Sequence, residues 1–373
     1  MRQILYNFFI VILVVVLTGC TDRIDLEDAT LIVTLGLDLD EHNNLVVFET
    51  SPIFSREAKN NTDHFDVQSS TVQRSYTNFD AVVSASTRNG KMQLLLIGKR
   101  LLKQKEILPY LDALYRDPKN STNLRMIAVD GPVSEVIHFE PKNKPRLSMY
   151  LSKMIDTSAM RHITSKVSLR KFHYMMVEPG ITPFISEIKK DKEELRVVGT
   201  TLLDDKGYYR TSLNLRETEL LDLVRNNQKA SYSFTIPVKK SGDNNKNKKN
   251  ISILVKPQRR YITTNYQDGV PQIDIEMKIV SSVTERTFQM NLEKEGNKRK
   301  LEAMIENEIN KQMATLIKKL QRHQVDPIGL GLYVRAYHYN KWKAINKPWT
   351  DIFAKSSIRF TSHVEIKNIG VVK

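Results

Sequence analysis

The sequence predicts an α+β protein of more than one domain, with mixed α/β organisation and a C-terminal antiparallel sheet backed by a long amphipathic helix. Apolar and polar residues alternate over residues 273–279 and 358–366, which is the period of a strand with one wet face. Apolar residues recur at three- and four-residue steps over residues 298–323, which is the period of a helix with one buried stripe. A chain of 373 residues is long enough for two or three domains.

The first element is an export signal. A short basic start precedes an apolar run over residues 4–17, and the run ends in Leu17-Thr18-Gly19-Cys20. Because the run is shorter than the roughly 20 residues of a membrane-spanning helix, residues 1–19 are interpreted as a signal peptide. The ending resembles a bacterial lipobox, which implies cleavage between Gly19 and Cys20 and a lipid on the Cys20 sulfur, with acyl chains such as palmitate. The alternative is a chance cysteine in an uncleaved N-terminal anchor helix.

Composition restricts what the mature chain can be. Residues 20–28 are polar and form a predicted tether, and no second long apolar run follows. Cys20 is the only cysteine, so a lipid there leaves no thiol for a disulfide or a metal site. The net charge of +15 favours attraction to anionic lipid headgroups. Nucleic acid is the other partner of basic proteins, but the export signal and the lack of a nucleic-acid motif argue against it.

Residues 29–190 are predicted to form an N-terminal mixed α/β region around one sheet. Helices are expected over residues 106–115 and 79–88, the latter capped by Asn78. The expected strands are 29–39, 45–50, 68–75, 92–97 and 124–129. Proline-punctuated helical stretches at 132–139, 146–158 and 165–177 indicate a possible mostly helical subdomain over residues 131–188. The charged run 189–196 is the expected boundary.

Residues 197–373 are predicted to form the C-terminal α+β domain. A hairpin is expected across Asp205-Lys206-Gly207, followed by an amphipathic helix over 215–226. Alternating strands follow at 232–238 and 251–255, separated by a low-complexity polar loop at 239–250. Helix 298–323 then covers the sheet that strands 273–279 and 358–366 complete.

Signatures of catalysis are missing from the sequence. It contains no phosphate-binding glycine loop, no dinucleotide fingerprint, no zinc-protease helix and no nucleophile elbow. The eight histidines are scattered, and His338 is interpreted as a packing residue. The carboxylate pairs Asp38/Asp40 and Asp204/Asp205 adjoin predicted turns, where aspartate commonly bonds to local backbone. The chain is therefore predicted to be no enzyme, with no cofactor and no metal site.

The segment 326–349 is the most unusual in composition. It follows the long helix and contains Asp326, Gly329, Gly331 and both tryptophans, Trp342 and Trp349. In one interpretation its aromatic residues seal the long helix onto the sheet. In the other, these residues form a surface for a protein partner or for the membrane interface.

Several stretches, taken in order, resemble the Ger(x)C family of spore germination lipoproteins. They are the lipobox followed by Asp22 and Arg23, IVTLGLD (32–38), MQLLLIGKRLLKQKEILPYLDALYRDP (92–118), VVGTTLLDD…LNLRETELLDLV (197–224) and the long-helix segment 305–353. The resemblance runs from residue 17 nearly to the end. Thr21 stands where the family often has tryptophan, and Pro327 where it tends to have another residue.

This resemblance implies a non-enzymatic C subunit of a nutrient germinant receptor. Such a subunit stands on the outer face of the spore inner membrane, held by its lipid, and assembles with the receptor's membrane A and B subunits to trigger germination. Two other functions stay open. The chain could be an extracytoplasmic solute-binding lipoprotein, which requires a polar-lined cleft between two domains, or a tethered envelope enzyme, which requires a perturbed carboxylate or histidine in a cleft.

Overall fold

The computed structural model describes residues 2–3, 29–53, 62–83, 86–88, 90–140, 143–225, 230–238, 249–344 and 348–369. The rest of the predicted signal peptide with Gly19, the predicted tether with Cys20, and most of the predicted loop 239–250 lie outside the described residues. Within the described part, no helix is both long and apolar enough to cross a membrane.

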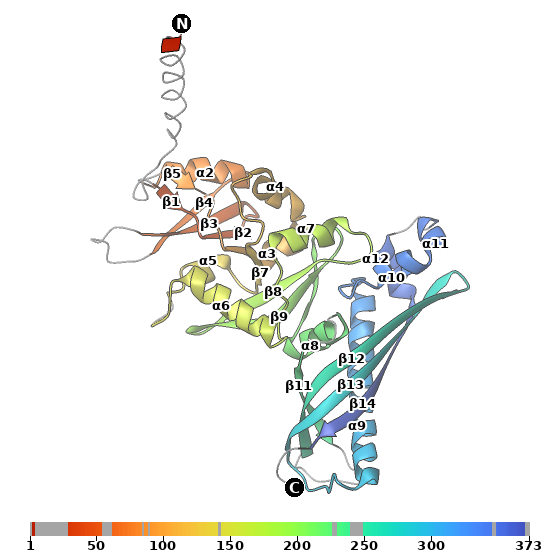
Figure 1. The fold of residues 1–373 in the computed structure, drawn as a ribbon. Helices are drawn as coiled ribbons and strands as arrows, with labels where there is room; N and C mark the ends of the chain where they lie inside the picture. The colour runs from red at the N-terminus through yellow and green to blue at the C-terminus, as the bar shows by residue number, and fades with distance from the viewer. Residues whose placement is uncertain are drawn as a thin grey trace.

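A mixed eight-stranded sheet forms the N-terminal part of the protein (Figure 1). The strand order is β10-β9-β8-β7-β6-β2-β3-β4. The four central strands β2, β6, β7 and β8 are parallel, and antiparallel hairpins flank them at both ends. The strands are β2 (Thr34–Leu39), β3 (Leu45–Pro52), β4 (Thr62–Gln68), β6 (Leu94–Gly98), β7 (Arg125–Val129), β8 (Phe184–Asp191), β9 (Glu194–Leu203) and β10 (Tyr209–Leu213). A small parallel pair, β1 (Ala29–Leu31) with β5 (Ser86–Arg88), lies beside this sheet.

Helices cover both faces of the eight-stranded sheet. Its buried strands are rich in leucine, isoleucine and valine on both faces, as expected of parallel strands between two helix layers. On one face lie α2 (Val72–Asp80), α3 (Lys99–Gln104), α4 (Leu108–Arg116) and α7 (Leu169–Val177). On the other lie α5 (Val133–Ile137) and α6 (Leu147–Met160). The segment predicted as a mostly helical subdomain thus supplies helices to both faces of this sheet.

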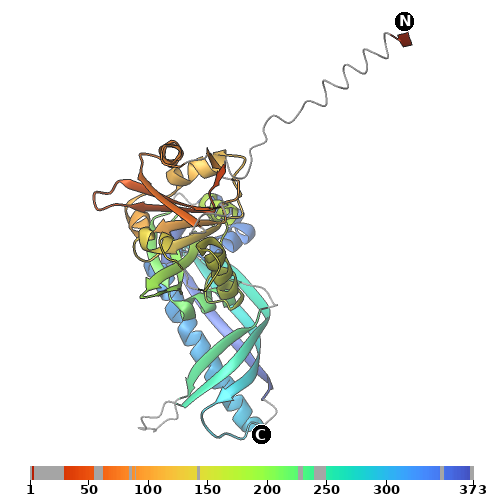
Figure 2. The same cartoon turned by 90° about the vertical axis from the view of Figure 1, so that its left-hand side faces the viewer.

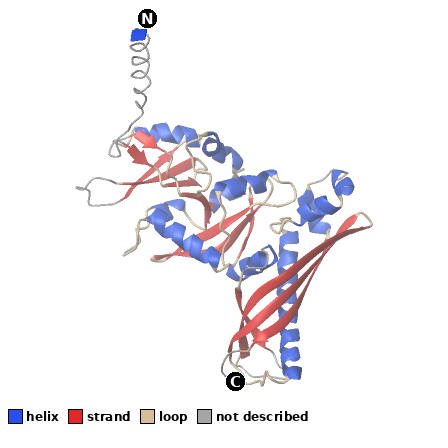
Figure 3. Cartoon of the chain, in the orientation of Figure 1, coloured by secondary structure: helices blue, strands red, loops and turns tan. Residues whose placement is uncertain are grey.

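A four-stranded sheet forms the C-terminal part, and the long helix α9 runs along it (Figures 1 and 2). Its order is β11-β12-β13-β14, antiparallel except that β14 runs parallel to β13. The elements are α8 (Leu215–Arg225), β11 (Tyr232–Val238), β12 (Lys249–Gln267), β13 (Val270–Arg286), α9 (Glu295–Arg322), α10 (Leu330–Tyr337), α11 (Tyr339–Lys343), α12 (Trp349–Lys355) and β14 (Ser357–Asn368). The predicted α+β class and the long helix backing the final sheet are confirmed (Figure 3).

The two sheets share one apolar core. A single cluster of buried side chains extends from strand β2 through α8 to α9 and the C-terminal sheet. Strands β8, β9 and β10 continue the N-terminal sheet across residues 184–213, so the sheet runs through the position of the expected boundary. The division of the chain at residues 190–197 stays a prediction.

The structure corrects the prediction between residues 68 and 88. The expected strand 68–75 and the expected helix 79–88 are both wrong, because the helix α2 begins at Val72 and ends at Asp80. Its N-cap is Thr71, whose hydroxyl oxygen accepts the Arg74 N–H at 3.1 Å, and not Asn78. The buried face of α2 includes Val72, Tyr76 and Phe79. This spacing of three and four residues is that of a helix, and it crosses the boundary predicted between a strand and a later helix.

Side chains of α9 cover the free edge of β14. The N–H groups of Ser362, Val364 and Ile366 donate to Asn310 Oδ1 at 2.8 Å, Glu306 Oε1 at 2.7 Å and Glu302 Oε1 at 2.7 Å. Four helical residues rise about 6 Å and two strand residues rise about 6.6 Å, so successive turns of α9 match alternate residues of β14. The helix therefore satisfies an edge that would otherwise be open to pairing with another chain.

Replacing Glu306 with alanine is expected to lower the free energy of unfolding by about 1–3 kcal/mol, because the Val364 N–H loses its acceptor at a buried residue. Urea unfolding followed by circular dichroism measures the change. Glu295→Ala is the control, since Glu295 is exposed at the start of α9 and its ion pair is with Arg299 one turn away on the same helix. Equal unfolding midpoints for the two variants would contradict the role given to Glu306.

Candidate functional site

The predicted segment 326–349 centres on the buried carboxylate of Asp326, which is fully shielded from solvent. Its Oδ1 accepts the Gly329 N–H at 2.9 Å, and its Oδ2 accepts the Gly331 N–H at 3.0 Å and the Trp349 indole N–H at 2.9 Å. Burial raises the pKa of Asp326 to about 6, although the Trp349 and backbone donors oppose the shift. Four of the five predicted site residues thus form one hydrogen-bonded group.

This group joins the C-terminal helices to the loop before β8. The Thr182 N–H donates to the Asp326 carbonyl at 3.0 Å, and Arg335 forms an ion pair with Glu178 at 2.6 Å. A Cβ added at Gly331 would lie 2.8 Å from the Gly180 backbone, so the two glycines allow the segments to touch. The hydrogen bond, the ion pair and the close backbone contact hold α10 against this loop.

Burial explains most of the predicted site residues as packing residues. Asp326, Gly329, Gly331 and Trp349 are buried, as the sealing interpretation requires. Trp342 is half-buried against Trp349, with 5.4 Å between ring centroids, and a partner contact there stays a prediction. The sealing interpretation does not extend to Tyr337, which is 68% exposed.

The carboxylate pairs divide into turn residues and one exception. Asp204 Oδ1 accepts the N–H groups of Lys206 and Tyr208, and Asp40 Oδ1 accepts those of His42 and Asn44, as predicted for turns. Asp38 is different, because its side chain is buried and Oδ2 accepts the distant Val133 N–H at 3.0 Å. This contact places Asp38 at a cleft that the sequence did not indicate.

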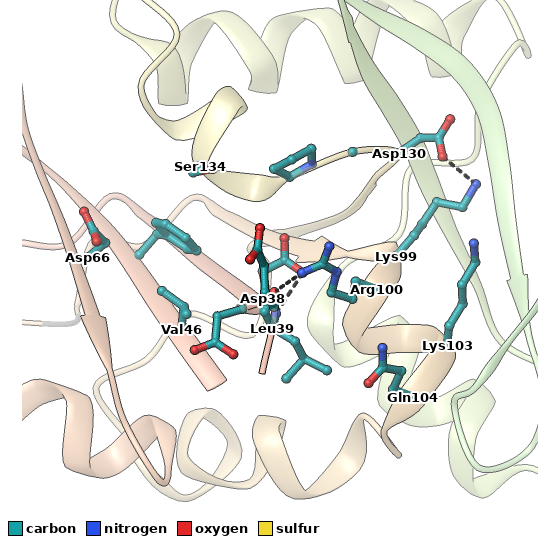
Figure 4. Close-up of a pocket in the computed structure, with 15 residues that line it drawn as sticks. Asp38, Leu39, Val46, Asp66, Lys99, Arg100, Lys103, Gln104, Asp130 and Ser134 are labelled. Atoms are coloured by element: carbon teal, nitrogen blue, oxygen red, sulfur yellow. Dashed lines mark hydrogen bonds and ion pairs between the residues drawn. The ribbon is translucent and has the colours of Figure 1, made fainter. Parts of the chain in front are cut away.

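The cleft lies at the carboxyl ends of the parallel strands β2, β6 and β7 and has a volume of about 710 Å³ (Figure 4). After β6 the chain enters α3, which packs on one face of the sheet, and after β7 it enters α5, which packs on the other. Adjacent parallel strands whose connections leave on opposite faces form a crevice at their carboxyl ends, and ligands of open α/β sheets bind there. The cleft occupies this crevice.

Asp38 forms part of the cleft floor. Its Oδ1 accepts the Leu39 N–H at 2.9 Å, and its carboxylate occupies the space that a side chain at position 98 would fill. A Cβ at Gly98 would overlap Asp38 Oδ1. Burial raises the pKa of Asp38, while the N–H groups of Val133 and Leu39 and the charge of Arg100 oppose that shift. Asp38 therefore links β2, β6 and α5 around the cleft.

Lys99 is held in an ion-pair network on one wall. Its Nζ lies 3.0 Å from Asp130 Oδ1, 3.0 Å from Glu187 Oε1 and 3.3 Å from Ser212 Oγ. The buried Glu187 also accepts the Thr201 hydroxyl at 2.6 Å. Burial would lower the pKa of Lys99, but Glu187 and Asp130 outweigh that effect and raise it overall. Lys99 therefore stays charged, with its charge already balanced.

Arg100 and Lys103 are the other cations of this wall, and both are exposed. Arg100 Nη1 donates to the Leu39 carbonyl at 3.3 Å, and Figure 4 shows its guanidinium in the middle of the cleft. Among the residues that the structure describes, neither cation forms an ion pair. The wall thus carries two cations that are not in an ion pair. In the described part of the chain, no group of three or more histidine, cysteine or acidic residues is placed to hold a metal.

The pattern of strand ends followed by charged residues was the available sequence signal for this cleft. Asp38, Lys99 and Asp130 each stand at or directly after the end of a predicted core strand. The carboxyl ends of these strands lie side by side only because the strands pair in parallel. Apolar runs in the sequence do not reveal the direction in which strands pair. The prediction therefore missed the cleft.

Comparison with known proteins gives matches along nearly the whole chain. A family model described as "Spore germination protein N-terminal domain" matches residues 22–190, and one described as "Spore germination B3/ GerAC like, C-terminal" matches residues 198–370. Spore germination protein GerQC of Bacillus cereus is 19% identical over 97% of this chain and 98% of its own. Spore germination protein B3 of Bacillus subtilis (strain 168) is 20% identical over 95% of each chain.

A solved structure shares the fold. The crystal structure of the GerBC protein covers 90% of this chain and 97% of its own, with a TM-score of 0.57 and 16% sequence identity. At that identity the match concerns the arrangement of helices and strands.

Proposed function

This chain belongs to the spore germination B3/GerAC-like family, and from that premise we propose that it is a non-catalytic subunit of a spore nutrient germinant receptor. In this proposal a lipid on Cys20 holds the protein on the outer face of the spore inner membrane. The folded part assembles there with the receptor's membrane A and B subunits, and the complex triggers germination.

The observation that carries the proposal is the succession of both family models along one chain, over residues 22–190 and 198–370. Relatives named as spore germination proteins match over nearly their full length, so the whole architecture is shared and not one module of it. The Leu-Thr-Gly-Cys ending at Cys20 resembles a lipobox and supports lipid anchoring. A lipid anchor with two acyl chains would hold the protein stably at the membrane, whereas a single chain binds only marginally.

The net charge supports a position at a membrane surface. The charge of +15 becomes +14 once Arg2 leaves with the signal peptide. Each basic residue held close to an anionic leaflet contributes about 1 kcal/mol of attraction. A basic protein tethered by a short segment such as residues 20–28 would therefore stay close to the headgroups.

Affinity purification from detergent-extracted spore membranes tests the proposal. The wild-type chain is expected to bring a multi-pass membrane protein with it, identified by mass spectrometry. Cys20→Ala is expected to lose the membrane fraction and that partner, because the thioether cannot form without the thiol. A wild-type chain that is membrane-bound but purifies without any membrane protein would contradict the receptor role.

The second candidate function is an extracytoplasmic solute-binding lipoprotein, and the polar cleft favours it. Ligand pockets are typically about 300–1,000 Å³ and hold a few polar groups on an apolar lining, and the cleft of about 710 Å³ falls in this range. The cleft lies at the strand ends of one sheet, however, whereas a solute-binding lipoprotein is expected to hold its ligand between two domains. The purification described above separates the two functions, since a solute-binding lipoprotein is expected to come from the spore membrane without a membrane partner subunit.

A further inference from the structure

We propose that the cleft at the carboxyl ends of β2, β6 and β7 binds a small organic carboxylate, with Arg100 and Lys103 as the groups that hold the carboxylate. The inference concerns the N-terminal sheet alone and does not depend on the receptor role. It uses the position of the cleft, the balance of its charges and its apolar wall.

The charge balance singles out the two cations. Most carboxylates of the cleft already have partners: Asp38 accepts two backbone N–H groups, Asp130 pairs with Lys99, and Asp40 accepts N–H groups of its own turn and of Gln68. Arg100 and Lys103 have no ion-pair partner among the described residues. A carboxylate of a ligand would therefore pair with these two cations without displacing an existing ion pair.

Arg100 has the geometry for a carboxylate. One of its five N–H donors is used by the Leu39 carbonyl, which fixes the guanidinium at the cleft centre. The remaining donors form the planar fork that matches a carboxylate in two parallel hydrogen bonds. Lys103 rises from the same helix one turn later, and its ammonium lies above the Tyr209 ring at 5.4 Å. The two side chains thus present positive charge from one wall.

The rest of the cleft suits an organic body. Val46, Phe48 and Pro132 supply apolar surface on the side of β3 and α5. Asp66, on β4, is an exposed acidic residue on the far side of the cleft from Arg100 (Figure 4). Glu41, in the turn between β2 and β3, is a second exposed acidic residue of the lining. An apolar body of a few carbons would cover the apolar wall, and an ammonium group on the ligand would face these acidic residues. The shared chemistry is the carboxylate, whether an amino acid or a simple organic acid supplies it.

Calorimetric titration of the full chain in detergent tests the proposal with three probes of one shape. L-leucine carries carboxylate and ammonium, 4-methylpentanoate carries the carboxylate alone, and 3-methylbutylamine carries the ammonium alone. We expect binding of at least one carboxylate probe at millimolar concentration and none of the amine. Comparable affinities for L-leucine and 4-methylpentanoate would indicate an organic acid, and tighter binding of L-leucine an amino acid.

Variants tie the binding to the cleft. Arg100→Gln is expected to weaken it at least about tenfold, because a charge-assisted pair is lost, and Arg100→Lys is expected to retain part of it. Arg170→Gln is the control, because Arg170 is exposed at the start of α7. Its backbone N–H donates to the Thr122 carbonyl just before β7 begins, so it lies near the amino end of β7 and away from the cleft at the carboxyl end. Thermal unfolding of each variant establishes that it is folded. No binding of either carboxylate, binding of the amine alone, or equal affinity in wild type and folded Arg100→Gln would overturn the proposal.

Discussion

Replacing Gly331 with alanine is expected to lower the free energy of unfolding by about 3 kcal/mol. The added Cβ would lie 2.7 Å from Trp349 Nε1, 2.8 Å from Gly180 Cα and 2.8 Å from the Gly180 carbonyl oxygen. Two of these atoms are backbone and the third is fixed by its hydrogen bond to Asp326 Oδ2, so none can yield cheaply. Relief requires α10 to move away from the loop that it packs against. Urea unfolding measures the loss.

Gly296→Ala is the matched control for this prediction. Gly296 lies in the first turn of α9, and nothing is within 4 Å of its Cβ position. Alanine there is expected to stabilise the protein slightly, since glycine in a helix costs roughly 0.5–1 kcal/mol relative to alanine. Opposite shifts of the two variants are expected from the same chemical change. A wild-type unfolding midpoint for Gly331→Ala would show that the contact with Gly180 is loose.

Glu49 is expected to make the stability fall as pH rises. Its side chain is 1% exposed, and among the residues that the structure describes neither carboxyl oxygen has a hydrogen-bond partner. Burial, assisted by the charge of Asp80, raises the pKa of Glu49 to about 9 from an ordinary 4.5. The folded protein therefore holds a proton that the unfolded chain releases above pH 4.5. The stabilisation is complete below pH 4.5 and is lost progressively as pH rises to about 9.

Glu49→Gln isolates this effect, because glutamine has the shape of the protonated acid and does not titrate. The variant is expected to match wild type at pH 5 and to exceed it at pH 8 by roughly 4 kcal/mol. Urea unfolding at both pH values measures the difference. Glu135→Gln, on the exposed side of α5, is the control and is expected to follow wild type. Parallel pH dependence of wild type and Glu49→Gln would contradict a buried, protonated Glu49.

The sequence predicted the elements whose apolar period is long and uninterrupted. The stripe of α9 and the alternation of β13 and β14 are confirmed, because each pattern is set by one buried face. The prediction for residues 68–88 was wrong because the segments there are short and both Thr71 and Asn78 are suitable N-cap residues. In short segments a single capping hydrogen bond decides the boundary, and neighbouring polar residues offer similar bonds.

The site was less predictable than the fold. Composition marked residues 326–349 as unusual, but it could not tell a buried aspartate with three N–H donors from an exposed one. The donors of Asp326 come from Gly329, Gly331 and Trp349, and only the folded chain aims them at one carboxylate. The cleft was missed entirely because its residues come from separate strand ends.

By itself the sequence determined the α+β class, the amphipathic long helix and the resemblance that places the chain among spore germination proteins. These follow from local periods and from motif order, which do not require knowledge of strand pairing. The tertiary structure alone decided which residues meet. The parallel pairing of β2, β6 and β7 brings Asp38, Arg100 and Asp130 to one cleft, and the contact of Gly180 with Gly331 buries Asp326. Such contacts join residues far apart in the chain, and their energies depend on strand direction and burial, which no local pattern encodes.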